Sequence, residues 1–287
     1  MFSRNVDLGP PLKSTPWRKV AVGTWRTVGD PSVYGVVEFD ATQSLKYIEK
    51  IRAQENVKIT LTHYIGKVVA KAIAENPQIN GILRFGKIYP RKSVDVFFQV
   101  ASDSKGNDLS GTTLRKVDLM TVAQIAREME AQIDAIRKKG DPVFKKSKNT
   151  MKMVPGFLVR YVLDLLGFVT YSLNLWSPLL GSPKDPFGSV MITNVGSLGL
   201  DFAFAPLVPY SRIPLLIAVG AVRDQPIARN GKVEVAPMLR LCATFDHRLV
   251  DGVHASHMVK SLQRIVANPE QELGLISESS SARFAME

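Results

Sequence analysis

Cysteine is almost absent from this chain, since only one of its 287 residues, Cys242, is a cysteine. A single thiol excludes an intrachain disulfide and fits a reducing compartment. Cys242 lies within an apolar stretch, so we expect its side chain to pack in the core rather than to react.

The chain also lacks several signals that would place it in other classes. Residues 1–7 have no apolar core of the kind an export signal needs, so we expect a cytoplasmic protein. We find no internal repeat and no glycine-rich phosphate loop. The formal net charge of +11 calls for an anionic partner, unless it belongs to a solvated surface without function. Because no zinc-ligand spacing, RNA-binding signature or recognition helix accompanies the charge, we expect no specific nucleic-acid binding.

The apolar patterning predicts a globular α/β fold, with 45% hydrophobic and 22% charged residues. Alternating and helical periodicities predict strands over 33–39, 79–83 and 94–101, and helices over 41–54, from Thr60 or Thr62 to Asn76, and over 121–138. His63 falls in the first turn of the second helix, where we expect it on the surface. Strands and helices mix without regular alternation, which favours an α/β sandwich with a mixed sheet.

One stretch places polar residues at a strand-to-helix turn. Residues 238–245 form an apolar strand pattern, and apolar residues recur at helical spacing from Ala255 to Val266. His247 and Asp251 lie between them. A histidine fixed at such a turn is a candidate proton acceptor, because imidazole titrates near neutral pH, and Asp251 could cap the helix or hold the loop. Taken alone, a buried histidine with a capping aspartate is the simpler explanation.

Four blocks of sequence carry a more specific signal, and they occur in a fixed order: Gly188–Gly199, Ala205–Pro209, Ile217–Val222 and Phe245–Gly252. Together they resemble the catalytic domain of the dihydrolipoamide acyltransferases of 2-oxo acid dehydrogenase complexes, and weaker similarity extends from Arg18 to Arg137. The resemblance implies a chloramphenicol acetyltransferase-like two-layer sandwich that assembles as a homotrimer or a multiple of trimers. It also implies coenzyme A or acyl-CoA as a substrate, which a basic channel would suit.

The same resemblance implies roles for individual residues. His247 would be the general base, Thr193 would donate a hydrogen bond to the oxyanion, and Asp251 would orient the loop. An arginine near the start, for which Arg18 is the candidate, would pair with Asp251. Among the residues of the Gly188–Gly199 block, Asn194 and Gly196 would contact the coenzyme. In the family the histidine and the hydroxyl come from adjacent subunits, so a monomer should be inactive.

The chain departs from the family pattern in two respects. Residues 104–111 replace a more apolar segment, which leaves the substrate channel there undefined. No lipoyl-lysine hairpin precedes residue 18, so we expect no covalently bound lipoyl group in this chain. A lipoyl-bearing protein could then act in trans, or the acceptor could be another molecule.

A further distinctive feature is a hydrophobic insertion at about 145–186, which begins with a run of lysines. We expect residues 1–17 to form an N-terminal arm and residues 18–287 to form the catalytic domain that contains this insertion. The uncharged span from Leu165 to Pro183 is interrupted by Gly167, Asn174 and Pro178, which argues against a membrane-spanning helix. The pattern favours an amphipathic hairpin that packs on a neighbouring subunit or covers the active site. Peripheral docking on a membrane surface is the alternative.

Other interpretations of the same motif are weaker. His254 and His257 could join His247 and Asp251 around a metal, but the spacing is not specific and we expect no metal. Condensation domains also carry a His-x-x-x-Asp-Gly motif, yet they place a second histidine where this chain has Asp246. A non-catalytic oligomeric scaffold or a membrane-associated assembly with the same fold is the alternative to an enzyme.

Overall fold

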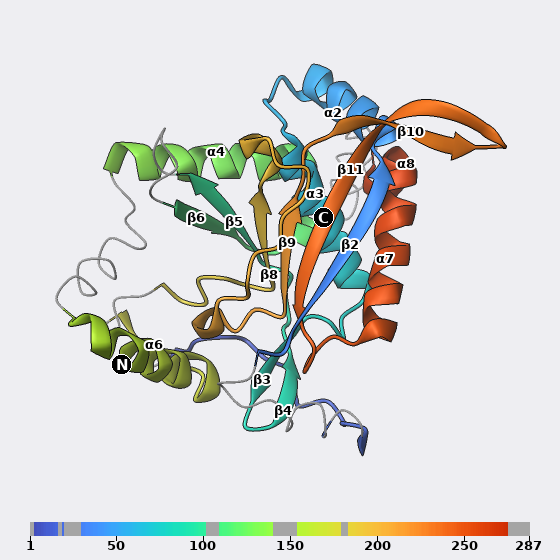
Figure 1. The fold of residues 1–287 in the computed structure, drawn as a ribbon. Helices are drawn as coiled ribbons and strands as arrows, with labels where there is room; N and C mark the ends of the chain where they lie inside the picture. Colours follow the sequence, from blue (N-terminus) through green and yellow to red (C-terminus); the bar gives the residue numbers. More distant parts are fainter. Residues whose placement is uncertain are drawn as a thin grey trace, which may run out of the picture.

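The protein is built around one seven-stranded mixed sheet whose one face is covered by helices (Figure 1). The computed structural model describes residues 3–16, 19, 30–101, 109–139, 154–178 and 183–274. The strand order is β10-β11-β9-β8-β5-β6, with β2 paired to β11. Only the β5–β8 and β8–β9 pairs are parallel, and the others are antiparallel. The predicted α/β sandwich with a mixed sheet is therefore confirmed.

The sheet strands are β2 (Ser32–Asp40), β5 (Val96–Ala101), β6 (Leu109–Leu114), β8 (Val190–Asn194), β9 (Leu215–Val219), β10 (Arg223–Arg229) and β11 (Lys232–Asp246). Two small pairs lie apart from it, β1 (Ser3–Arg4) with β7 (Leu175–Trp176) and β3 (Gly81–Arg84) with β4 (Lys87–Pro90). The helices are α2 (Thr42–Glu55), α3 (Leu61–Glu75), α4 (Val122–Lys139), α6 (Gly156–Gly167), α7 (Gly252–Ala267) and α8 (Pro269–Leu273). Short turns are η1 (Val117–Leu119), η2 (Phe168–Ser172, a π-helical turn), η4 (Gly196–Leu198) and η5 (Pro209–Ser211).

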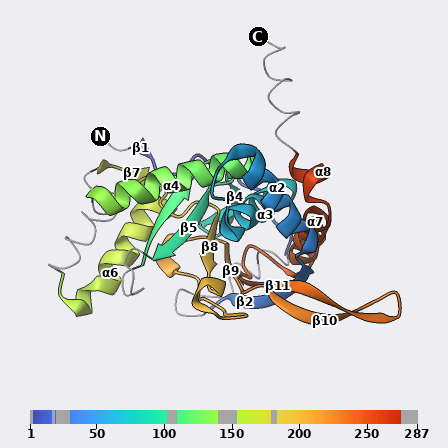
Figure 2. The same cartoon turned by 90° about the horizontal axis from the view of Figure 1, so that it is seen from above.

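The helices form where the sequence supplies both a cap and an apolar stripe. Thr60 caps α3, and its side chain accepts a hydrogen bond from the His63 backbone. The apolar residues Ile65, Val68, Val69 and Ala72, which share one face of α3, are fully buried in the main core. The helix covering is completed by α2, α4 and α7, which lie on the same side of the sheet as α3 (Figure 2).

The two faces of the sheet differ, and this difference positions the site. On β8, Val190 and Ile192 join the main core with the helices, whereas Met191 belongs to a smaller cluster on the opposite face with Phe97 and Leu216. Because side chains alternate along a strand, Thr193 points to the same face as Met191. The chain between η4 and η5 covers part of this helix-free face, since it packs apolar side chains on the smaller cluster.

One sequence prediction is wrong and another is confirmed. His63 is in the first turn of α3 as expected, but it is buried rather than on the surface, with 9% of its area exposed. Burial away from water lowers the pKa of His63 to about 4. Its ring instead completes the helix cap, because the Thr60 N–H donates to His63 Nδ1 at 3.2 Å. Cys242 is buried as predicted, and burial raises the pKa of its thiol.

The described part of the insertion packs against the N-terminal arm of its own chain. Strand β7 pairs with β1, which sets Trp176 opposite Ser3. Asn174 extends this pairing through its side chain, because its Oδ1 accepts from the Val6 N–H and its Nδ2 donates to the Val6 carbonyl at 2.7 Å. Val6 is thereby buried with Tyr171 of η2. The arm and the insertion thus form one small unit beside the sheet.

Within the described ranges, we find no helix that combines the length and the apolar character that crossing a bilayer requires. The lysine run of residues 145–152 lies outside those ranges.

Candidate active site

The turn after β11 is organised by Asp246, a residue to which sequence reasoning assigns no role. Its backbone carbonyl accepts from the N–H groups of Leu249 and Val250, both at 2.9 Å. Its buried carboxylate accepts from the Arg248 backbone at 2.9 Å and from the Arg248 guanidinium, with Nη2 at 2.7 Å. Leu249 and Val250 are buried in the main core. The turn is therefore fixed both by hydrogen bonds and by its apolar anchors.

His247 projects from this fixed turn and is half-buried. Its backbone N–H donates to the Pro31 carbonyl at 2.9 Å, and its ring Nδ1 lies 2.9 Å from the Val250 carbonyl. A carbonyl oxygen only accepts, so we assign the ring proton to Nδ1, and Nε2 is then the accepting nitrogen. This tautomer is the one that a general base requires.

Asp251 begins helix α7 as its N-cap. Its Oδ1 accepts from the backbone N–H groups of Val253 at 3.1 Å and His254 at 3.0 Å. The His254 ring completes a capping box, because its Nδ1 accepts from the Asp251 backbone N–H at 3.4 Å. We call residues 246–250 the histidine turn. Asp251 thus joins the histidine turn to a rigid helix. Its predicted partner Arg18 lies outside the described residues.

Thr193 lies far from His247 within one chain. In the sheet register Thr193 is opposite Ala218, which in turn is opposite Cys242 on β11. His247 follows Cys242 by five residues along the chain. At about 3.4 Å per residue and about 4.8 Å between strands, the two backbones are separated by roughly 17 Å along the sheet and roughly 10 Å across it. The two side chains cannot act on one carbonyl group within a single copy.

The two residues predicted to contact the coenzyme both have structural roles. Asn194 donates from Nδ2 to the Thr62 hydroxyl at 2.8 Å and accepts the Ser197 N–H at 3.0 Å, so it connects β8 to the start of α3. At Gly196, a Cβ atom would lie 2.5 Å from the Gly220 carbonyl oxygen, so only glycine fits there. Their contact with coenzyme A stays a prediction.

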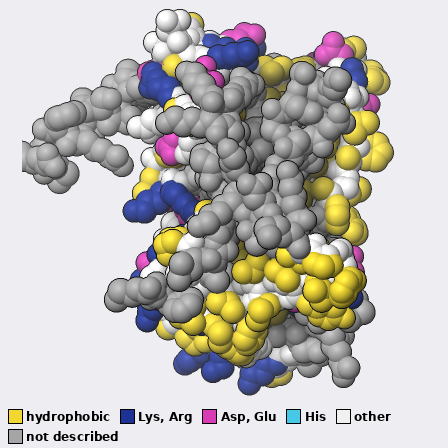
Figure 3. All heavy atoms as spheres, turned by 90° about the vertical axis from the view of Figure 1, so that its left-hand side faces the viewer, with side chains coloured by type: hydrophobic (Ala, Val, Ile, Leu, Met, Phe, Trp, Pro, Cys, Tyr) yellow, Lys and Arg dark blue, Asp and Glu magenta, His cyan; other side chains and the backbone are white. Residues whose placement is uncertain are grey.

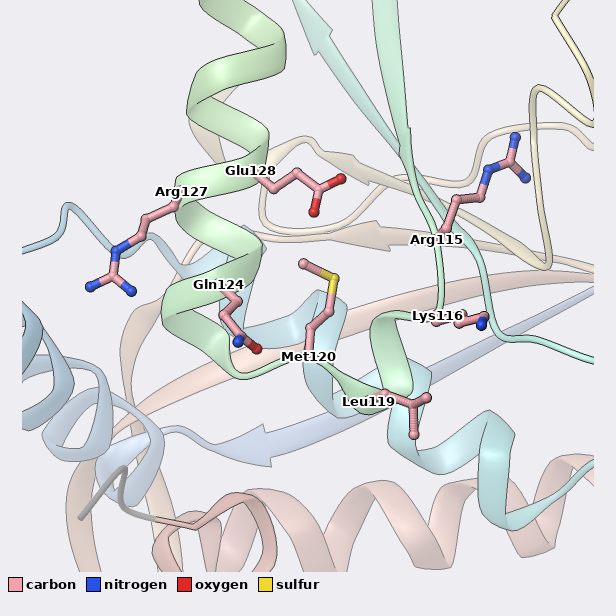
Figure 4. Close-up of a pocket in the computed structure, with 7 residues that line it drawn as sticks. All are labelled: Arg115, Lys116, Leu119, Met120, Gln124, Arg127 and Glu128. Atoms are coloured by element: carbon pink, nitrogen blue, oxygen red, sulfur yellow. The ribbon is translucent and has the colours of Figure 1, made fainter. Parts of the chain in front are cut away.

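No group of three or more potential metal ligands comes together among the described residues. A surface hollow of about 560 Å³ lies elsewhere, where β6 leads through η1 into α4 (Figure 4). Its arginines are already paired, Arg115 with Asp95 at 2.9 Å and Arg127 with Glu55 at 2.5 Å. In Figure 4 these two side chains extend away from each other, and the hollow contains none of the predicted site residues.

Comparison with known families and proteins gives a consistent result. Residues 22–141 and 186–273 match the model of the 2-oxoacid dehydrogenases acyltransferase catalytic domain. A curated relative, the dihydrolipoyllysine-residue succinyltransferase component of the 2-oxoglutarate dehydrogenase complex of Haemophilus influenzae, is 25% identical over 229 residues. That match covers 79% of this chain and 45% of the relative, so the chain spans less than half of that protein's length.

Solved structures resemble the whole fold at low sequence identity. The dihydrolipoamide acetyltransferase of Azotobacter vinelandii, described with the role of a serine, a histidine and an asparagine in its catalytic mechanism, matches with a TM-score of 0.63 and 20% identity. The match covers 92% of this chain and 99% of that one. A chloramphenicol acetyltransferase matches with a TM-score of 0.51 and 16% identity over 87% of this chain and 94% of that one. These likenesses agree with the fold predicted from sequence.

Proposed function

Since this chain belongs to the 2-oxoacid dehydrogenase acyltransferase catalytic-domain family, we propose that it transfers an acyl group between coenzyme A and an acceptor. The acceptor is a thiol of the dihydrolipoyl type, carried by another protein, or a different nucleophile. The active site lies at the interface between two copies of the chain in a homo-oligomer. We take this homo-oligomer to be a trimer or a multiple of trimers.

The chemistry needs one base and one oxyanion donor. His247 Nε2 takes the proton from the acceptor thiol as its sulfur attacks the thioester carbonyl of acyl-CoA. The Thr193 hydroxyl donates a hydrogen bond to the oxygen that becomes negative in the tetrahedral intermediate. Collapse of the intermediate breaks the carbon–sulfur bond to coenzyme A, and the leaving thiolate recovers the proton from His247. Asp251 does not exchange protons in this scheme, because it holds the turn through the helix cap.

The observation that carries the proposal is the separation of Thr193 from His247 in the sheet register. Within one chain the proposed base follows β11 and the proposed oxyanion donor lies on β8, at opposite ends of two strands that β9 separates. A second copy that packs on that face would bring its own histidine turn to Thr193. The Azotobacter enzyme supports the assignment, because its named histidine and asparagine have the same four-residue spacing as His247 and Asp251.

An exposed apolar surface lies on the face that such a second copy would cover. Tyr34 and Val36 of β2 point away from the helices, and each leaves 49% of its area exposed. Phe204 contacts Tyr34 edge-on, with ring centroids 5.3 Å apart, and Phe202 is also exposed. We call Tyr34, Val36, Phe202 and Phe204 the sheet-face patch. Contiguous exposed apolar surface of this kind is typical of subunit contacts.

A complementation experiment tests the shared site. His247→Ala and Thr193→Ala are each expected to lower acyl transfer from acyl-CoA to dihydrolipoamide by about a hundredfold or more. When the two variants are refolded together in equal amounts, an interface is intact if its histidine comes from a Thr193→Ala copy and its threonine from a His247→Ala copy. Random mixing gives this combination at about a quarter of the interfaces. Activity should therefore recover to about a quarter of the native value, measured as release of the coenzyme A thiol.

The matched control is His257→Ala, since His257 lies on the exposed side of α7 and should be replaceable without loss. Mixed variants that stay as inactive as each variant alone would show that both residues act within one copy, which contradicts the proposal. A native protein that assembles but transfers no acyl group from any acyl-CoA would favour the non-catalytic scaffold.

A further inference from the structure

Helix α6 is apolar around almost its whole circumference. Its sequence, GFLVRYVLDLLG, contains only two charged residues, Arg160 and Asp164. The side chains of Val162, Leu163 and Leu166 are partly buried. A helix that is hydrophobic all round is normally buried all round. In this chain only one side of α6 is covered by the described residues.

The other side presents large apolar residues to solvent. Phe157, Tyr161 and Leu165 follow one another at four-residue spacing, with 76%, 67% and 63% of their areas exposed. Phe168 of η2 continues the row and contacts Phe85 at the tip of the β3–β4 hairpin, with ring centroids 6.3 Å apart. Phe85 is itself 67% exposed. We call Phe85, Phe157, Tyr161, Leu165 and Phe168 the α6 patch.

The sequence that leads into α6 carries an excess of basic residues. Figure 3 shows a broad band of hydrophobic side chains low on this face of the molecule, with Lys and Arg side chains along its rim. Lys87, next to the hairpin tip, is exposed. The single acidic residue of the sequence from 142 to 178, Asp164, is paired with Arg160 at 3.8 Å. Against it, the same stretch holds five basic residues, namely Lys145, Lys146, Lys148, Lys152 and Arg160.

We propose that the α6 patch docks this protein on the surface of a membrane that carries anionic phospholipids. Apolar and aromatic side chains of the patch enter the boundary between headgroups and acyl chains, while the neighbouring basic residues lie against lipid phosphates. A second copy of the chain is a poorer occupant, because residues 145–160, which lead into α6 in the sequence, hold five basic residues and no acidic one and would repel the same stretch of another copy. The family model matches residues on either side of this segment but not residues 142–185, so docking is a property added to the acyltransferase fold.

Vesicle binding of the full chain tests the proposal. The native protein is expected to float with vesicles of phosphatidylcholine mixed with phosphatidylglycerol, and to float less at high salt because screening weakens the lysine contacts. The triple variant Phe157→Ser, Tyr161→Ser, Leu165→Ser should bind these vesicles about tenfold more weakly or worse, since it removes three apolar anchors.

Two single variants test whether vesicle binding depends on the α6 patch or on any exposed leucine. Leu165→Ser should weaken vesicle binding severalfold, whereas Leu119→Ser, at a leucine 65% exposed in η1, should leave it unchanged. A native protein that ignores anionic vesicles, or a triple variant that binds them as well as the native protein, overturns the proposal. So does a triple variant whose oligomer mass changes in lipid-free buffer, because the patch would then contact another copy. Acyl transfer in lipid-free buffer is independent of these outcomes and should be unaffected by the triple variant.

Discussion

The histidine turn and helix α6 differ in how their side chains are packed. In the turn, the carboxylate of Asp246 is buried and saturated by Arg248, and Asp251 accepts two backbone N–H groups. On α6, by contrast, Phe157 and Tyr161 lie in solvent. The turn belongs to the part of the chain that the family model matches, whereas α6 lies between the two matched segments.

The difference separates what this chain shares with its family from what it adds. A turn with its polar groups satisfied and its leucine and valine anchored is rigid, as a catalytic group must be. A helix with exposed apolar surface is instead suited to contact another surface, such as a membrane or a second protein. We call the sheet, the helices that cover it and the histidine turn the framework. Variants that perturb the framework should cost stability or activity, while variants on the exposed side of α6 should cost neither in lipid-free solution.

The largest stability effect within the framework is expected at His63. Its pKa is about 4 in the folded chain and about 6.5 when unfolded, so the unfolded state binds more protons between these values. The stabilising contribution is complete above about pH 6.5 and is lost as the pH falls towards 4, by up to about 3 kcal/mol. His63→Gln keeps an acceptor for the Thr60 N–H but cannot titrate.

The free energies of unfolding of the native chain and of His63→Gln, measured by urea denaturation from pH 7.5 to 4, give the test. The difference between the two should shift in favour of the variant as the pH falls. His257→Gln, at an exposed position of α7, controls for loss of a histidine. A difference that stays constant over the range would mean that His63 is hydrated in the folded chain.

A pair of glycines compares the two regions directly. Gly196→Ala places a Cβ 2.5 Å from the Gly220 carbonyl oxygen and 2.6 Å from the Ala221 nitrogen, so it should cost about 2 kcal/mol. Gly156→Ala, at the start of α6, meets nothing within 4 Å and should stabilise by about 0.5 kcal/mol. Urea midpoints measure both changes. Equal effects at the two positions would refute the contrast between a tightly packed framework and an open insertion.

Sequence reasoning recovers most of the framework because its signals are local. Helix α7 runs from Gly252 to Ala267 with Asp251 as its N-cap, close to the cap and the apolar spacing that the sequence indicates. Strand β11 is longer than predicted and begins at Lys232, although Asn230-Gly231 before it is a strong hairpin signal. Both residues adopt positive φ there, and β10 folds back along β11.

Non-local features could not be predicted in the same way. The burial of His63 depends on what packs over the first turn of α3, which local periodicity does not reveal. The β1–β7 pair joins segments about 170 residues apart and relies on the Asn174 side chain to mimic a strand. The family resemblance implied that His247 and Thr193 come from adjacent subunits, and the strand register adds how far apart they lie within one chain. In the described part of the insertion, α6 is followed by a π-helical turn, while residues 145–153 of the predicted hairpin lie outside the described residues.

The smallest loss of stability is expected at Asp251, where the cap and the chemistry can be tested separately. Asp251→Ala removes the acceptor for two backbone N–H groups and should cost about 1 kcal/mol, with a loss of activity because the histidine turn loosens. Asp251→Asn should retain both stability and most activity, since asparagine caps a helix about as well as aspartate. Thermal unfolding and kcat at saturating acyl-CoA provide the two readouts. If Asp251→Asn folds normally but is as inactive as Asp251→Ala, the carboxylate charge itself is needed, and an arginine partner such as Arg18 becomes the next residue to replace.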